Sequence, residues 1–223
     1  MPDIDVREQT TSDGDAHGRH VTLGARLRDE RTERRLSLRE LARRLDVSPS
    51  LISQIETGKI QPSVRTLYAI VSELGVSLDD VFASADADSG HPALTGPGGA
   101  ARPRERADAP AGPVQRADSR TVIDLETGVR WERLTTRNES GVEFLLTVYP
   151  PESESSPADA LVRHTGREFG IVLRGHLHVT IGFEDYQLGP GDSVYFDSTI
   201  PHRLYNVGGT PVEAVWVVLG RQQ

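Results

Sequence analysis

Between Leu23 and Phe82 the apolar residues recur every three to four positions, which is typical of helices with one buried face. Residue pairs that favour helix starts interrupt this pattern at three places: Ser37 with Glu40, Ser48 with Pro49, and Ser77 with Asp80. Gly58 and Gly75 suit positions just past a helix end, because glycine adopts the left-handed backbone conformation at little cost. The pattern predicts five helices, near residues 22–34, 37–45, 48–56, 63–74 and 78–83.

After Arg120 the pattern changes to short runs rich in apolar and β-branched residues. Turn residues separate these runs, namely Gly175, Gly189-Pro190-Gly191 and Gly208-Gly209. The runs predict strands near residues 122–125, 129–134, 143–149, 168–173, 177–183, 193–196, 202–206 and 213–219. Short strands with turns at these intervals are typical of an antiparallel sandwich or barrel.

Composition sets the expected domain limits within the 223 residues, a length that suggests two domains. Residues 1–20 are polar and acidic with little to bury, so we expect a disordered tail there. Residues 85–119 are rich in Ala, Gly, Pro, Asp and Arg, which predicts a flexible linker that spans on the order of 30 to 35 Å. The expected fold is therefore multidomain α and β, with a five-helix domain at residues 21–84 and an antiparallel β-barrel at residues 120–223.

Charge and composition narrow the class of protein. The net charge is -8, yet residues 21–60 carry nine basic and six acidic side chains, so the helical region is locally positive. The absence of cysteine excludes disulfides and thiolate metal sites. No apolar run approaches the roughly 20 residues that cross a bilayer, and residues 1–20 hold no signal-sequence core. We predict a cytoplasmic protein with no membrane partner.

The segment from Ser37 to Lys59 predicts two short helices joined by a tight turn. In the second helix, Ile52 and Ile55 are three positions apart and are expected to face the core. A polar stripe lies on the opposite side of this helix and contains Ser50, Ser53, Gln54 and Thr57. Such a helix can enter a DNA groove. The same spacing also occurs in an ordinary amphipathic helical hairpin whose polar face is in contact with solvent.

The segment from Leu23 to Phe82 resembles the helix-turn-helix domain of phage-repressor-type (XRE family) regulators. The matching strings are Leu41-Ala42, Val47-Ser48, Ile52-Ser53-Gln54-Ile55-Glu56-Thr57-Gly58-Lys59 and Pro62-Ser63. The resemblance implies that the helix after Ser48 enters the major groove of double-stranded DNA. It makes Pro49, Ser50, Leu51 and Ser53 candidates for base contacts. The candidates for the phosphate backbone are Arg39, Gln54 and Lys59, together with the helix starts at Ser37 and Ser48.

Three strings in the second half resemble the two motifs of a cupin, a double-stranded β-helix barrel: 164–175, 188–196 and 201–206. Cupins commonly hold a divalent metal with a His-x-His pair, a Glu four residues later and a late His. Val162 occupies the first His position here, which leaves His164, Glu168 and His202. The even spacing of His164 and Glu168 places both on one face of a regular strand.

Two interpretations of these three residues remain open. Two imidazoles and a carboxylate can hold iron with open coordination positions, and Mn, Zn or Ni are further candidates. Alternatively, the loss of one ligand marks a metal-free pocket in which the three side chains bind a small molecule or one another. The candidate effector pocket contains Val162, His164, Glu168, Tyr195, His202 and Trp216. The aromatic members of this set could equally fill the interior of the barrel.

Together these features predict a sequence-specific DNA-binding transcriptional regulator whose cupin domain senses a small-molecule effector, and not an enzyme. The family implies homodimers, often formed through the barrels, with two reading helices about 34 Å apart along the duplex. The alternative is a non-haem iron cupin enzyme that resembles the hydroxypropylphosphonate epoxidases, which share the two-domain layout and an iron held by two His and one Glu. A nucleoid-type structural binder is a third possibility, for which a ligand pocket would be superfluous.

Overall fold

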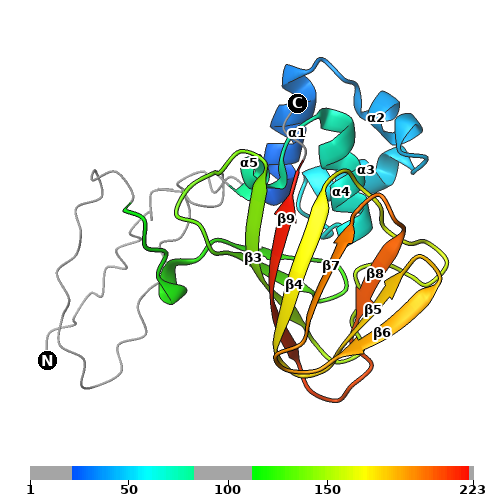
Figure 1. Cartoon of the computed structure of the whole chain (residues 1–223). Coiled ribbons are helices and arrows are strands. Elements are labelled where there is room, and N and C mark those ends of the chain that lie inside the picture. Colours follow the sequence, from blue (N-terminus) through cyan, green and yellow to red (C-terminus); the bar gives the residue numbers. More distant parts are fainter. Residues whose placement is uncertain (1–21, 83–111, 221–223) are drawn as a thin grey trace, which may run out of the picture.

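The computed structural model describes residues 22–82 and 112–220 (Figure 1). The predicted tail and the predicted linker up to residue 111 lie outside these residues. Residues 22–82 form five helices, each within two residues of its predicted limits: α1 Leu23–Glu33, α2 Leu38–Arg44, α3 Pro49–Glu56, α4 Val64–Leu74 and α5 Leu78–Phe82. None of the helices in the described ranges is long and apolar enough to cross a membrane.

The predicted helix caps are confirmed at atomic detail. The hydroxyl of Ser37 accepts a hydrogen bond from the Glu40 amide at 3.1 Å, and that of Ser48 accepts one from the Leu51 amide at 3.1 Å. These bonds satisfy amide donors that have no partner within the helix. Helix α4 ends at Gly75 in the left-handed conformation, with φ of 63°, as its position in the sequence predicts.

A buried ion pair fixes α1 against the end of α3. The Arg31 Nε and Nη2 atoms lie 2.6 and 2.8 Å from the two carboxylate oxygens of Glu56, and Nη1 donates to the Leu36 carbonyl at 2.7 Å. Close packing accompanies this pair, since a Cβ on Gly24 would lie 2.0 Å from the Ile55 carbonyl oxygen. The orientation of α3 is therefore held by both polar and steric contacts.

Residues 112–220 contain a short 3₁₀ helix, Ala117–Ser119, followed by nine strands. The strands are β1 Val122–Asp124, β2 Arg130–Arg133, β3 Val142–Tyr149, β4 Arg167–Arg174, β5 Leu177–Ile181, β6 Glu184–Leu188, β7 Ser193–Asp197, β8 His202–Tyr205 and β9 Val212–Leu219. They form a six-stranded sheet in the order β1-β2-β3-β9-β4-β7 and a three-stranded sheet in the order β6-β5-β8. All pairs are antiparallel, as predicted, but no ladder between described strands joins the two sheets into the closed barrel that the sequence predicts.

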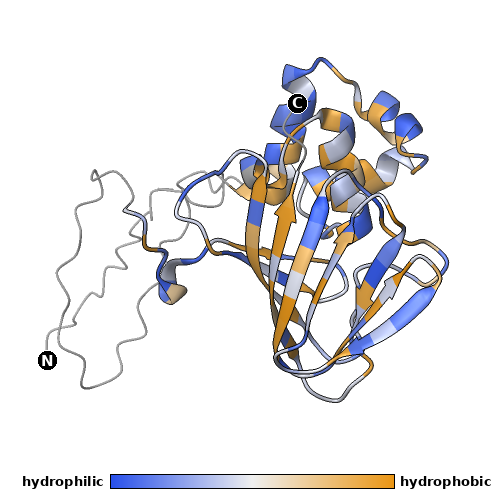
Figure 2. Ribbon diagram, in the orientation of Figure 1, coloured by the Kyte–Doolittle hydropathy of each residue, from blue (hydrophilic) through white to orange (hydrophobic). Residues whose placement is uncertain are grey.

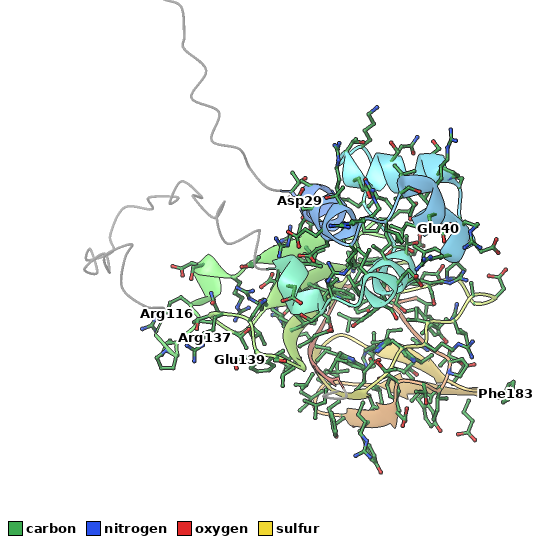
Figure 3. All side chains as sticks on the ribbon, turned by 90° about the horizontal axis from the view of Figure 1, so that it is seen from above. Asp29, Glu40, Arg116, Arg137, Glu139 and Phe183 are labelled. Atoms are coloured by element: carbon green, nitrogen blue, oxygen red, sulfur yellow. The ribbon has the colours of Figure 1, made fainter. Side chains whose placement is uncertain are left out.

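The sequence predicts a strand over residues 177–183, of which β5 covers residues 177–181, but it does not predict β6. The chain turns at Gly182, with φ of 65°, and returns as β6. Strand β6 is an edge strand whose side chains are mostly exposed, so its sequence lacks the alternation that marks a half-buried strand. Phe183 at the tip of this hairpin projects away from the rest of the molecule (Figure 3).

The helices lie directly against one end of the sheets, so the two halves are in contact as well as tethered (Figure 1). Buried apolar residues from both halves form one continuous cluster. Figure 2 shows hydrophobic residues on α4 and along β3 and β9, where the halves meet. Polar contacts complete the interface: the Glu126 amide donates to the Pro62 carbonyl at 3.1 Å, and the Asn138 amide group donates to Asp80 at 3.0 Å.

Candidate DNA interface and candidate ligand pocket

Helix α3 has one buried and one open face. Ile52 and Ile55 are each 1% exposed and pack into the core, as the sequence predicts. The predicted DNA-binding residues lie at the surface: Ser37, Arg39, Ser48, Pro49, Ser50, Gln54 and Lys59 are exposed, and Leu51 and Ser53 are partly exposed. The polar stripe is therefore available to a partner.

The cations around α3 differ in how far they are already neutralised. Arg43 and Arg44 both bind the carboxylate of Glu40, and these hydrogen bonds lower the pKa of Glu40 to about 2. Within the described residues, Arg39 and Lys59 form no ion pair, so their charges are available for phosphate oxygens. Part of the positive charge counted in the sequence is therefore neutralised by Glu40. In the described part of the chain, Arg39 and Lys59 keep their charges free on this face.

A small cavity lies between the two sheets and under α4. His164 comes from the segment before β4, Glu168 from β4 and His202 from the start of β8. The Oε1 atom of Glu168 lies 2.9 Å from Nε2 of His164 and 3.1 Å from Nε2 of His202. The predicted cluster is therefore formed, although His164 precedes the strand and the strand-alternation argument does not explain its position.

Contacts behind the cluster orient its members. Nδ1 of His202 lies 2.8 Å from the Ile200 carbonyl oxygen, and Nδ1 of His164 lies 3.3 Å from that of Thr165. When each Nδ1 donates to its carbonyl, both Nε2 atoms present lone pairs towards Glu168. The other Glu168 oxygen, Oε2, accepts a hydrogen bond from the Trp216 indole at 2.7 Å.

This donor set fits a divalent cation. Glu168 Oε1 is buried without a well-directed hydrogen bond, and the three ligand atoms lie within 4.8 Å of one another. Adjacent ligands of a metal with bonds near 2.1 Å are about 3 Å apart, similar to the distances here. His164, Glu168 and His202 could therefore hold a metal ion such as Fe, Mn, Zn or Ni.

The same three residues also form a self-consistent set without metal. Burial acts to raise the pKa of Glu168, but contacts with the His164 and His202 imidazoles outweigh it and hold the pKa well below its usual range. Burial acts to lower the pKa of His164, and the Glu168 carboxylate reverses this so that the net shift is upward. A proton between these groups can thus take the place of a cation, and the metal-free interpretation stays open.

Five of the six residues predicted for the effector pocket line the cavity: Val162, His164, Glu168, His202 and Trp216. The prediction for Tyr195 is wrong. Tyr195 is 76% exposed and pairs with Phe169 on the outer face of the sheet, because strand alternation turns the neighbouring Phe196 inwards instead. Val162 is buried at the missing ligand position and exchanges two backbone hydrogen bonds of 2.9 Å with His202.

The sequence did not point to two cavity residues that come from the helical half. Val64 and Tyr68 of α4 line the cavity together with the sheet residues. The Tyr68 ring stacks on the His164 ring with a centroid distance of 4.2 Å. Both residues fit the ordinary apolar pattern of α4, so no signal in the sequence distinguishes them from core residues.

Gly170 is required for the position of Trp216. The two residues face each other across β4 and β9, and a Cβ on Gly170 would lie 1.9 Å from the Trp216 ring. We expect Gly170→Ala to push the indole away from Glu168 and to lower the free energy of unfolding by about 1 to 3 kcal/mol. Urea denaturation followed by tryptophan fluorescence measures this change. Gly112→Ala is the control, because nothing lies within 4 Å of its Cβ; equal effects would contradict this account.

Comparisons with known proteins agree with this two-part architecture. A helix-turn-helix family model matches residues 27–81, and a cupin domain model matches residues 145–218. A solved structure of an HTH_3 family transcriptional regulator from Vibrio cholerae has the same fold, with a TM-score of 0.61 and 20% identity, covering 90% of this chain and 96% of that one. The fold and the exposed face of α3 thus define a helix-turn-helix protein with a C-terminal cupin domain.

Two curated relatives place the chain more closely. The HTH-type transcriptional regulator PuuR of Escherichia coli (strain K12) is 26% identical over 184 residues, which cover 82% of this chain and 86% of PuuR. An uncharacterized transcriptional regulator in the ATPase CF(0) region of Rhodospirillum rubrum is 37% identical over 92 residues, which cover 41% of this chain and 77% of that protein. The chain belongs to the XRE-type helix-turn-helix transcriptional regulators that carry a C-terminal cupin domain.

Proposed function

We propose that this protein is a sequence-specific DNA-binding transcriptional regulator whose cupin domain senses a small-molecule effector. The observation that carries the proposal is the open polar face of α3, on a helix whose opposite face is buried in a helix-turn-helix core. Ser50 and Ser53 would contact base edges, with Pro49 and Leu51 beside them, while α3 lies in the major groove. Arg39, Gln54 and Lys59 would hold the phosphates, together with the helix starts at Ser37 and Ser48.

The test is a selection for bound DNA. Purified full-length protein is incubated with a pool of genomic fragments, and the fragments that remain bound at physiological salt are sequenced. We expect enrichment of a few fragments that share a motif, with an affinity at least about 1,000-fold above that for random DNA. Uniform recovery of all fragments would support a nucleoid-type binder instead, and recovery of none would contradict DNA binding.

We propose further that two chains associate through the outer face of β4, β7 and β9. This face carries apolar side chains in contact with solvent: Phe169 is 38%, Ile171 40%, Leu173 46% and Tyr195 76% exposed. Burying such a patch against a second copy removes apolar surface from water. A two-fold dimer would present two α3 helices to successive major grooves, about 34 Å apart.

A charged side chain on this face is expected to dissociate the dimer. We expect Ile171→Glu to give monomers at micromolar concentration and to weaken DNA binding, because one half-site then has to bind alone. Sedimentation velocity measures the oligomeric state. Val207→Glu is the matched control, since Val207 is 65% exposed but lies outside this face. A wild-type protein that sediments as a monomer would contradict the proposed dimer. It would not bear on DNA binding, which the selection of bound fragments tests separately.

The pocket is proposed as the effector site, with the two sheets as the walls of a cupin barrel. A cation held by His164, Glu168 and His202 would supply a Lewis acid that binds an anionic or carbonyl group of the effector. The same cluster supports the alternative, a non-haem iron cupin enzyme. Metal analysis of the purified protein separates the two: stoichiometric iron with oxygen consumption would favour the enzyme. Because a regulator works on the chromosome, we propose that the protein is cytoplasmic.

A further inference from the structure

The inner cavity and a larger outer groove are separated by a single pair of stacked rings. The cavity encloses about 30 Å³, room for one or two waters, whereas the groove between α4, α5 and the ends of β3 and β9 measures about 660 Å³. Tyr68 and His164 line both spaces. The Tyr68–His164 pair is therefore the partition between the two.

Tyr68 belongs to the DNA-binding half, yet its contacts are with the cupin half. Its ring stacks on His164 at 4.2 Å with an interplanar angle of 10° and meets the edge of Trp131 at 5.7 Å. Its hydroxyl donates a hydrogen bond of 3.0 Å to Glu143 on β3. Three residues of the cupin half thus hold the Tyr68 side chain over the cavity.

We propose that Tyr68 is the gate of the effector site, and that an effector larger than one or two waters binds only when Tyr68 leaves the cavity mouth. Small-molecule sites usually measure hundreds of Å³, so the closed cavity is too small for an organic effector. This proposal rests on the proposed regulatory function and adds the route of entry and the element that moves.

The gate opens with the whole DNA-binding domain, because α4 cannot move alone. Val64, one turn before Tyr68, also lines the cavity. Leu67, Ile70 and Leu74 anchor the other side of α4 in the helical core and are at most 3% exposed. An effector that displaces Tyr68 therefore shifts the five helices relative to the cupin half. The effector binds more tightly when the helices have moved away from the cupin half than when they lie against it. This difference in affinity stabilises the moved arrangement and couples the pocket to DNA binding.

The gate can be tested without knowing the effector. Diethylpyrocarbonate modifies accessible imidazoles, and mass spectrometry of peptides gives the rate at each histidine. His202 is 3% exposed inside the cavity, whereas His176 is exposed and serves as the internal control. We expect wild-type His202 to react at least about 10-fold more slowly than His176, because it reacts only when the gate opens.

Two variants define the role of Tyr68. Tyr68→Ala removes the partition and is expected to raise the His202 rate about 10-fold, with the His176 rate unchanged. Tyr68→Phe keeps the ring and loses only the hydrogen bond to Glu143, so an intermediate rate is expected; it also tests the gate if the alanine variant does not fold. Wild-type His202 that reacts as fast as His176, or variants that leave its rate unchanged, would overturn the proposal.

A cross-link tests whether the domain moves with the gate. The chain contains no cysteine, so Gln61→Cys with Glu126→Cys gives a unique pair at the contact where the Glu126 amide meets Pro62. Joining the two thiols with a short bifunctional reagent should slow His202 modification further, and the unjoined double variant is the control. An unchanged rate would show that the side chain rotates alone and would overturn the domain movement. Because no DNA is used, these results are independent of the test for DNA binding.

Discussion

Replacing Ser50 and Ser53 together by glutamate is expected to lower the affinity for a selected DNA site by at least about 100-fold. Both residues lie on the open face of α3, where the proposed complex brings them next to base edges and phosphates. The change removes two contacts and places two negative charges among phosphate groups. Ser50 lies in the first turn of α3, where an acidic side chain favours the helix, so the fold should be retained.

Fluorescence anisotropy with a labelled duplex measures this loss. The matched control is Ser119→Glu with Gln187→Glu, which adds the same charge at exposed positions of the sheet half. We expect the control to bind within a few-fold of wild type, since long-range repulsion is screened at physiological salt. Equal losses in the two double variants would show that α3 is not the reading element.

The second large effect is expected at the buried ion pair of Arg31 and Glu56. Glu56→Ala leaves the Arg31 guanidinium buried and removes two of its three hydrogen bonds described above, so that of these only the bond to the Leu36 carbonyl is kept. The variant should reduce the free energy of unfolding by about 3 to 5 kcal/mol. The pair joins α1 to the end of α3, so the loss should also weaken DNA binding. Asp124→Ala breaks an exposed pair with Arg130 and should cost at most about 1 kcal/mol.

The two halves of the chain can be followed separately in this experiment. Both tryptophans, Trp131 and Trp216, belong to the sheet half, while circular dichroism at helix wavelengths reports mainly on residues 22–82. We expect urea denaturation of the Glu56→Ala variant to show an early loss of helix signal, ahead of the change in tryptophan fluorescence. A variant as stable as Asp124→Ala by both signals would contradict a structural role for the pair.

Local rules were sufficient for the helical half. The capping residues Ser37 and Ser48 act within one turn of the chain, so the sequence predicts where α2 and α3 begin. The same holds for Gly75, whose left-handed conformation ends α4. Strand β6 was missed because it is an exposed edge strand without apolar alternation.

The pocket was predictable only in part. The motif correctly predicts that three side chains come together, those of His164, Glu168 and His202. Each of them lies on a strand or next to one, and the motif fixes their positions along those strands. Tyr195 was misplaced, since the sequence does not say which of two adjacent aromatic residues on β7 faces inwards. Tyr68 could not be predicted at all, because its role depends on how two separate halves of the chain pack together.

The most direct test of the account is cross-linking from α3 to DNA. A photoreactive side chain at position 53, in place of Ser53, is irradiated in the complex with a selected duplex, and the same side chain in place of Ser119 is the control. The account predicts cross-links to bases exposed in the major groove from position 53 and none from position 119. Cross-links from the sheet half, with none from α3, would contradict it.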